Sequence, residues 1–129
     1  MPYKEDGTHF KSISRQTLFY GEHDLPVEVR YFEIQAEGYS TLEKHQHAHL
    51  VMVIQGSGKC LVGDRVFEVR PFDIVHVPPL TWHQFRAMNG ETLGIHCLVN
   101  EERDRPQRPG PEEIEELKQN SDVGAFIRY

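Results

Sequence analysis

Apolar and polar side chains alternate regularly from residue 27 to residue 34, where the sequence reads VEVRYFEI. A period of two residues, together with several β-branched and aromatic side chains, predicts a β-strand. The residues before this strand are weakly patterned, apart from a short strand predicted at Gln16–Tyr20. We therefore expect residues 1–26 to form an N-terminal arm or an edge strand.

Six more segments carry strand signals and are separated by turn residues. They are Leu50–Ile54, Lys59–Val62, Arg65–Val69, Asp73–Val77, His83–Arg86 and Leu93–Val99. The first of these is wholly apolar, which predicts a strand buried on both faces. Gly63-Asp64 joins the second and third, and predicts a hairpin with a type II′ turn because glycine readily adopts the positive φ of the first central position.

A further strand is predicted to run from Ser40 into residues 43–49. The chain then has about eight or nine short strands, with turns every 8 to 12 residues or so and no helix before its tail. This arrangement is typical of an antiparallel barrel or a double-sheet sandwich. We expect an all-β domain that spans residues 27–100.

Residues 101–129 have a different character and are predicted to form a linker, a short helix and a C-terminal tail. Glu101–Pro111 is charged and proline-rich, as linkers are. Glu112–Gln119 is predicted to be helical, with Pro111 and acidic residues suited to its first turn. The apolar tail Val123–Tyr129 needs a surface to lie on, which can be one end of the barrel or a neighbouring subunit.

Length and charge limit the kinds of partner. A chain of 129 residues is most simply one domain with one site. Its net charge of -6 and its lack of a long Lys/Arg block argue against nucleic acid or a membrane surface as partner, and favour a small molecule. The polar start Met1–Lys11 lacks the apolar centre of a secretory signal, so we expect a cytoplasmic protein.

Cys60 and Cys97 form no Cys-x-x-Cys pair and are predicted to be buried free thiols.

Four side chains that can bind a metal occupy alternate positions just before the first apolar strand. They are Glu43, His45, His47 and His49. Imidazole suits zinc, nickel, copper and iron, and a carboxylate adds affinity for manganese. The three histidines would spread over about 13 Å along a straight strand, so the chain must bend here if more than two of these residues bind one ion. The simpler alternative to a metal site is that these residues form a polar strand face. Three histidines and a glutamate beside an apolar strand favour the metal site. His83 can be brought to this site from another strand.

Two other histidines lie in predicted strands. Leu93, Ile95 and Cys97 share the apolar face of their strand, which places His96 on the opposite face, exposed or at a subunit contact. His76 lies in an apolar strand, where it either forms a hydrogen bond in the core or lines a pocket.

The histidine cluster followed by an apolar strand and Gly56-Ser57-Gly58, together with VRPFDIVHVPPLTWHQF at residues 69–85, resembles a small single-domain cupin. The resemblance implies a double-stranded β-helix, or jelly-roll barrel. The first cupin motif is Gly, five residues, His-x-His, three or four residues, Glu, six residues, Gly. Counted back from Gly56, it places His49 at the Glu position, with His45 and Glu43 at the two His positions. The other register, with His45 and His47 as the His-x-His, puts an apolar residue at the Glu position.

The second cupin motif is Gly, five residues, Pro-x-Gly, two residues, His, three residues, Asn. Pro78 and His83 match it, while Phe72, Leu80 and Ala87 replace the two glycines and the asparagine. By resemblance, the metal ligands are Glu43, His45, His49 and His83, with His47 a reserve ligand or pocket residue. Glu43 is instead a candidate acid/base if it does not bind the ion.

Cupins include dioxygenases, isomerases, decarboxylases, lyases and non-catalytic sensing domains. The resemblance therefore implies an enzyme of oxygenase, isomerase or lyase type that acts on a small molecule in the barrel. Its cofactor is expected to be one divalent transition metal ion per chain, namely Zn, Ni, Fe, Mn or Cu. The alternative is a non-catalytic binding or sensor module with a bound metal. Small cupins commonly pair, so we also expect a homodimer.

Overall fold

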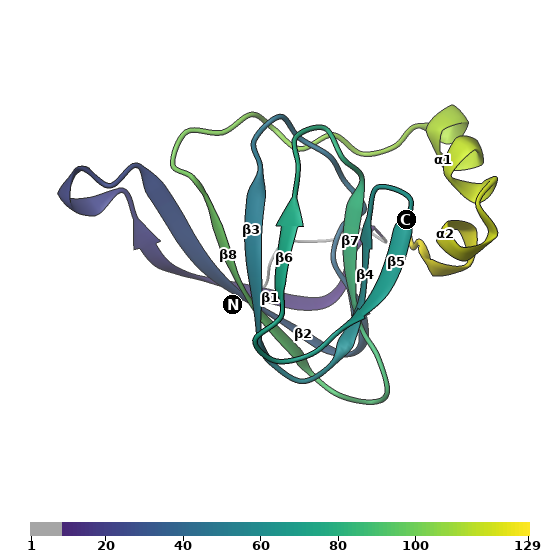
Figure 1. Ribbon diagram of the computed structural model, residues 1–129, viewed down its shortest axis with the longest axis horizontal. Helices are drawn as coiled ribbons and strands as arrows, with labels where there is room; N and C mark the ends of the chain where they lie inside the picture. Colours follow the sequence, from purple (N-terminus) through teal and green to yellow (C-terminus); the bar gives the residue numbers. More distant parts are fainter. Residues whose placement is uncertain (1–8) are drawn as a thin grey trace.

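The computed structural model describes residues 9–129, which form one curled antiparallel sheet followed by two short helices (Figure 1). The eight strands are β1 Lys11–Tyr20, β2 Val27–Tyr39, β3 His49–Gln55, β4 Gly58–Val62, β5 Arg65–Val69, β6 Ile74–Val77, β7 His83–Ala87 and β8 Leu93–Asn100. They lie in the order β5-β4-β7-β2-β8-β3-β6, and β1 pairs with β2 outside this path. The prediction of an all-β fold is confirmed.

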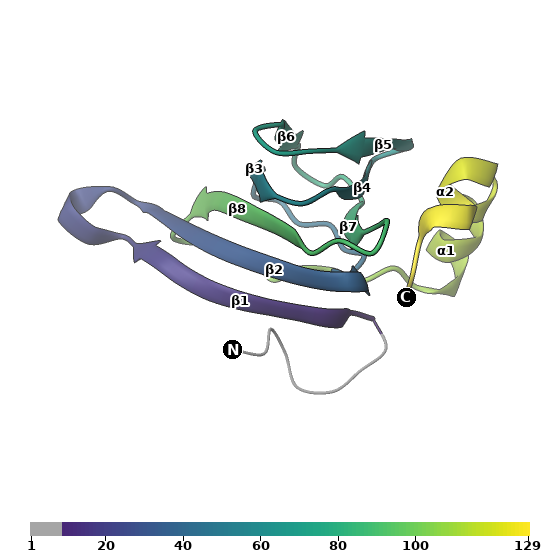
Figure 2. The same cartoon turned by 90° about the horizontal axis from the view of Figure 1, so that it is seen from below.

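The curl of the sheet produces two layers that face each other. Strands β1, β2, β8, β3 and β6 form one layer and β5, β4 and β7 the other (Figure 2). The layers join where Tyr39 of β2 pairs with Arg86 of β7. Apolar side chains from both layers fill the space between them, among them Ile34, Val53 and Leu93, which have no exposed surface. Full burial of one such side chain contributes about 1.5–3 kcal/mol to stability.

The N-terminal strand is longer than the predicted Gln16–Tyr20, because β1 begins at Lys11. It pairs only with β2 among the described strands, in a register that sets Arg15 opposite Phe32 and Thr17 opposite Arg30. A short 3₁₀ turn at Glu22–Asp24 joins the two strands. The first eight residues of the predicted arm lie outside the described residues.

The prediction that the strand at Leu50–Ile54 is buried on both faces is wrong. Val51 and Val53 of β3 are buried in the core, but Leu50 and Met52 are 44% and 37% exposed. None of the elements in residues 9–129 covers the outer face of this layer, so its apolar side chains reach solvent, among them Leu50 and Met52. His96 of β8 is half-buried on this face. His76 of β6 is exposed on it as well and lines a small pocket with Ile74 and Val75, so the expected place in the core is wrong and the expected place at a pocket is confirmed.

The hairpin between β4 and β5 follows the predicted geometry. Val62 pairs with Arg65 across the two-residue loop. Gly63 has φ +68°, whereas Asp64 is not in the positive-φ region, as a type II′ turn requires. Gly56 is required for another reason, because a Cβ at this residue would lie 1.7 Å from the Thr92 carbonyl oxygen.

Two helices follow the sheet, where one was predicted. α1, Pro111–Lys118, matches the expected helix, and α2, Ser121–Phe126, was not foreseen. The Asn120 side chain caps α2 by accepting hydrogen bonds from the backbone N–H groups of Asp122 and Val123. The tail lies on its own barrel, where a second apolar cluster contains Leu42, Leu61, Val123, Phe126 and Ile127. Among residues 9–129, no helix is long and apolar enough to cross a membrane.

Candidate metal centre

The metal-binding cluster lies in an irregular segment between β2 and β3. The predicted strand from Ser40 into residues 43–49 is wrong, because β2 ends at Tyr39 and β3 begins only at His49. Two residues of this stretch are hydrogen-bonded to β7. Ser40 N–H donates to the Phe85 carbonyl oxygen, and Glu43 and His83 exchange both backbone hydrogen bonds in an isolated bridge. The chain bends at Gln46 and His47. This bend is the one that a shared ion requires.

The bend and the bridge bring three histidines together. One ring nitrogen each of His45, His49 and His83 forms a group in which all three atoms lie within 4.8 Å of one another. The ring centroids of His45 and His49 are 4.2 Å apart, and that of His83 lies 4.8 Å from His45 and 5.4 Å from His49. These three predicted ligands can therefore share one ion.

Hydrogen bonds fix the tautomers of two of these rings. His45 Nδ1–H donates to the His47 carbonyl oxygen at 2.7 Å, and His83 Nδ1–H donates to the Thr81 carbonyl oxygen at 2.9 Å. Each Nε2 is then left with a lone pair, as metal-bound histidine requires. The Nε2 atoms of His45 and His49 are buried and have no hydrogen-bond partner within the described part of the chain. A metal ion fits this donor set, because it would satisfy both orphaned nitrogens.

Burial keeps these rings in the form that binds metal. It lowers the pKa of His83 to about 4, and it also lowers the pKa values of His45 and His49 from their ordinary value. The positive charge that His83 and His45 would carry if protonated adds to the effect on His49. All three imidazoles are therefore neutral at physiological pH, and no proton competes with an ion for them.

Glu43 and His47 lie beside the triad and outside its group of converging atoms. The Glu43 side chain is 8% exposed and lines the cavity next to His45 and His49. The His47 ring stacks on His45 with centroids 3.8 Å apart, and its Nδ1 lies 2.7 Å from Asp104 Oδ1. Both residues thus belong to the cavity wall.

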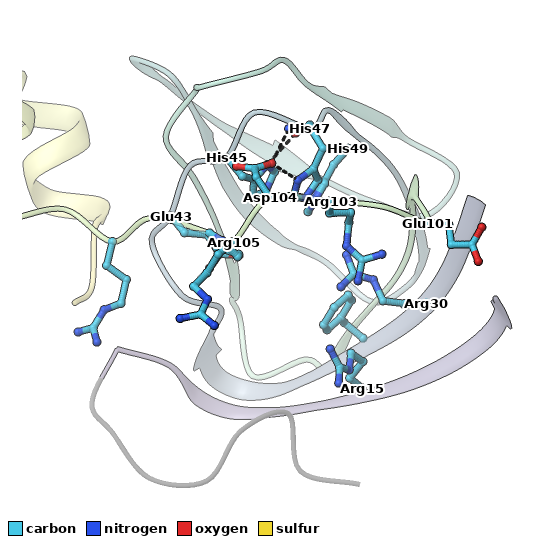
Figure 3. A pocket seen from close by; sticks show the side chains of 13 residues that line it. Arg15, Arg30, Glu43, His45, His47, His49, Glu101, Arg103, Asp104 and Arg105 are labelled. Atoms are coloured by element: carbon cyan, nitrogen blue, oxygen red, sulfur yellow. Dashed lines mark hydrogen bonds and ion pairs between the residues drawn. The ribbon is translucent and has the colours of Figure 1, made fainter. Parts of the chain in front are cut away.

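The segment predicted as a linker forms part of the site. Asp104 accepts hydrogen bonds from the backbone N–H of Gln46 at 2.7 Å, and from the backbone N–H and the ring of His47 at 3.0 and 2.7 Å (Figure 3). Burial alone would raise the pKa of Asp104, but these hydrogen bonds outweigh it and hold the pKa well below its usual range. Gln107 exchanges two backbone hydrogen bonds with Lys44 on the same side of the site. The segment is irregular in conformation but fixed in place.

Replacing Asp104 with alanine should destabilise the protein by about 1–3 kcal/mol, because three hydrogen bonds to a carboxylate are lost and two backbone N–H groups lose their partner. Urea unfolding of the metal-free protein measures this change. Glu102→Ala is the matched control, since Glu102 is an exposed carboxylate two residues away. Equal stability of the two variants would contradict the role of Asp104.

A cavity of about 650 Å³ opens beside the histidines. Residues from β1, β2, the bend and the segment after β8 line it, namely Arg15, Arg30, Phe32, Glu43, His45, His47, His49, Glu101, Arg103, Asp104, Arg105, Pro106 and Arg108. The five arginines and Asp104 were not predicted as site residues. The charged run after residue 100 and the charges inside the strand at residues 27–34 could have indicated all of them except Arg15.

A thiol also faces this centre. Cys97 and Cys60 are both buried and free, as predicted. The Cys97 Sγ atom lies 3.4 Å from His49 Nδ1 and 3.5 Å from Arg30 Nη2, and it lines a small space next to the triad together with Glu43. Burial raises the pKa of this thiol, and the Arg30 guanidinium partly offsets the rise. Cys60 instead lies in the apolar core.

Known proteins are similar to this chain in sequence and in fold. Residues 30–99 match the cupin domain family. The chain is 48% identical over 128 residues to the 1-methylthio-D-xylulose 5-phosphate methylsulfurylase of Rhodospirillum rubrum, a match that covers 98% of this chain and 81% of that protein.

Solved structures give the same result. A cupin 2 conserved barrel domain protein from Rhodopseudomonas palustris superposes with a TM-score of 0.96 at 48% identity, covering 100% of this chain and 89% of that one. A cupin-2 domain protein from Rhodospirillum rubrum gives a TM-score of 0.92, also at 48% identity, with 96% and 83% covered. The resemblance read from the two motifs is thereby confirmed, and the chain belongs to the cupin family.

Proposed function

We propose that this protein is a metal-dependent enzyme that acts on a small phosphorylated sugar carrying a methylthio group. The observation that supports this most directly is the convergence of three neutral histidines and a thiol between the large cavity, which His45 and His49 line, and the small space lined by His49, His83 and Cys97. The relative from Rhodospirillum rubrum is named for such a molecule. Its name directs the proposal towards chemistry at a carbon–sulfur bond, among the oxygenase, isomerase and lyase types expected for the fold.

In this proposal His45, His49 and His83 hold one divalent transition metal ion from the set Zn, Ni, Fe, Mn and Cu. When bound, such an ion supplies Lewis-acid polarisation of a substrate carbonyl. Glu43 is either its fourth ligand or the acid/base beside it, and His47 is a pocket residue held by Asp104, with metal binding its reserve role. Glu43 is well placed for proton transfer because it lines both the large cavity and the small space in front of Cys97.

Cys97 is the proposed acceptor of the methylthio group. A neutral His49 that offers its Nε2 to an ion must carry its proton on Nδ1, so both Nδ1–H of His49 and Nη2–H of Arg30 then point their protons at the Cys97 sulfur. Two donors favour the thiolate form. The thiolate attacks the methylthio sulfur, a methyl disulfide forms, and the carbon–sulfur bond breaks with its electron pair left on the carbon. That carbon takes up one proton, and an external thiol then releases the methylthio group by disulfide exchange.

Incubation of the metal-loaded protein with 1-methylthio-D-xylulose 5-phosphate and a small thiol tests the proposal. We expect catalytic loss of this compound by mass spectrometry, which stops when either the thiol or the metal is withheld. The matched control is the same protein after treatment with a chelator. Tight binding without turnover would replace the enzyme with the alternative, a non-catalytic ligand-binding or sensor module. A homodimer in the cytoplasm stays a prediction.

A further inference from the structure

The inner face of β2 carries charged side chains where a barrel usually has apolar ones. Glu28 and Arg30 are only 4% and 8% exposed, and they share this face with Phe32 and the fully buried Ile34. A buried charge lowers stability unless it is paired or used to bind a charged partner. The position of this pair at the cavity end of β2 therefore requires an explanation.

Two more arginines adjoin this face. Arg15 of β1 lies opposite Phe32, so it is a diagonal neighbour of Arg30 on the same side of the β1–β2 pair. Arg103 donates a hydrogen bond from Nη1 to Glu28 Oε2, which anchors the segment after β8 to the same strand. Figure 3 shows Arg103, Arg30 and Arg15 one after another along one side of the cavity, with Arg103 nearest to the three labelled histidines and Arg15 farthest from them.

Arg30 retains binding capacity that the protein itself does not use. Its Nη2 donates to the Cys97 sulfur and its guanidinium lies over the Phe32 ring, 5.1 Å from the centroid. Its Nε is buried and has no hydrogen-bond partner among residues 9–129. The side chain lines the cavity, so a ligand there is the natural acceptor for this N–H group.

Charge defines the class of that ligand. Three arginines and Glu28 together carry a formal charge of +2, in a chain whose net charge is -6. A phosphate monoester carries close to two negative charges at neutral pH and offers three acceptor oxygens. Arginine is the side chain best suited to it, since the planar guanidinium donates two parallel hydrogen bonds.

We infer that Arg15, Arg30 and Arg103 form the binding site for the phosphate group of the substrate, with Arg30 as its buried anchor and Glu28 holding Arg103 in place. The inference rests on the proposed function for the rest of the substrate. It places the phosphate at the arginine side of the cavity and the reacting end at the histidine side. The enzyme would then select phosphorylated sugars through Arg15 and Arg103, which take no part in the chemistry, and through Arg30, which also donates to the Cys97 sulfur.

Calorimetric titration with D-xylulose 5-phosphate and with D-xylulose tests this site in the metal-loaded protein without any turnover. We expect the phosphorylated sugar to bind at least about tenfold more tightly, as loss of charge-assisted hydrogen bonds implies. Arg30→Gln and Arg15→Gln should each remove most of this preference and leave the weak binding of D-xylulose unchanged. Arg70→Gln is the control, because Arg70 is exposed and does not line this cavity.

Inorganic phosphate should compete with D-xylulose 5-phosphate in the wild-type protein and lose this effect in both variants. Arg15 is only half-buried, so Arg15→Gln keeps the test valid if Arg30→Gln does not fold. The inference is overturned if wild-type protein binds the two sugars equally or not at all, or if folded variants keep the preference. If the protein prefers the phosphorylated sugar but shows no turnover, the phosphate site stands and the proposed enzyme activity is refuted. If it shows turnover without this preference, the enzyme activity stands and the phosphate site is refuted.

Discussion

Replacing His83 with alanine is expected to reduce bound metal from about one ion per chain to almost none. His83 comes from β7, whereas His45 and His49 come from the segment that precedes β3 and from its first residue. Loss of His83 leaves His45 and His49, which lie on one stretch of chain. It also removes the only candidate ligand that the second motif supplies. Changes to residues that merely orient a ligand weaken metal binding about 10–100-fold, so loss of a ligand should cost more than this.

Elemental analysis after gel filtration measures this loss, with far-UV circular dichroism to check the fold. His76→Ala is the matched control, because His76 is exposed on the outer face of β6 and should leave the metal content unchanged. His83→Gln provides a second variant that fills more of the buried space. Retention of a full equivalent of metal in folded His83 variants would show that the ligand set is wrong.

The positions of the candidate ligands could be predicted because the motifs fix them by counting. His49 and His45 are located by counting back from Gly56. This residue must be glycine, because a Cβ there would collide with the Thr92 carbonyl oxygen. The same register places the first glycine of the motif at Glu37, which has φ +66°. The sequence could not show that the chain leaves the strand before the cluster, because alternating side chains are equally compatible with an extended bend.

The departures from the second motif have a physical reading in the structure. Phe72 and Leu80 stand where glycine is usual, and both adopt positive φ, +72° and +53°. A left-handed residue other than glycine costs about 1–2 kcal/mol. The turn is nevertheless kept, since the Leu80 N–H donates to the His45 carbonyl oxygen at 2.7 Å. The backbone at Phe72 and Leu80 thus keeps the conformation that suits glycine, although neither residue is a glycine.

The arginine side of the cavity was not predicted, for two reasons. Alternation in β2 shows that two faces exist but not which of them is inside, and here the face with Glu28 and Arg30 is the buried one. The segment after β8 has no periodicity at all, so its contacts with Gln46 and His47 depend on the folded structure alone. The short helix α2 escaped prediction because six residues are too few to establish a helical period.

Replacing Cys97 with alanine is expected to lower the turnover of 1-methylthio-D-xylulose 5-phosphate by at least about 1,000-fold, the scale on which loss of a nucleophile acts. The reason is local, because the Cys97 sulfur is the thiol that adjoins both a candidate ligand and the cavity-lining Arg30. Cys60→Ala is the matched control. Its thiol lies in the apolar core, where burial raises its pKa and no arginine or histidine contacts it within the described residues, so turnover should be retained.

Two further measurements separate a chemical role of Cys97 from a structural one. Cys97→Ala should keep most of its metal content and of its affinity for D-xylulose 5-phosphate. It removes one contact each of His49 and Arg30, but it leaves the hydrogen bonds that orient His45 and His83 and the Phe32 ring under Arg30 in place. Wild-type protein mixed with substrate in the absence of external thiol should gain the mass of one methylthio group, on the tryptic peptide that contains Cys97, and Cys97→Ala should not. If Cys97→Ala turns over normally, or if the added mass lies elsewhere, the methylthio group leaves by a route that does not involve this residue.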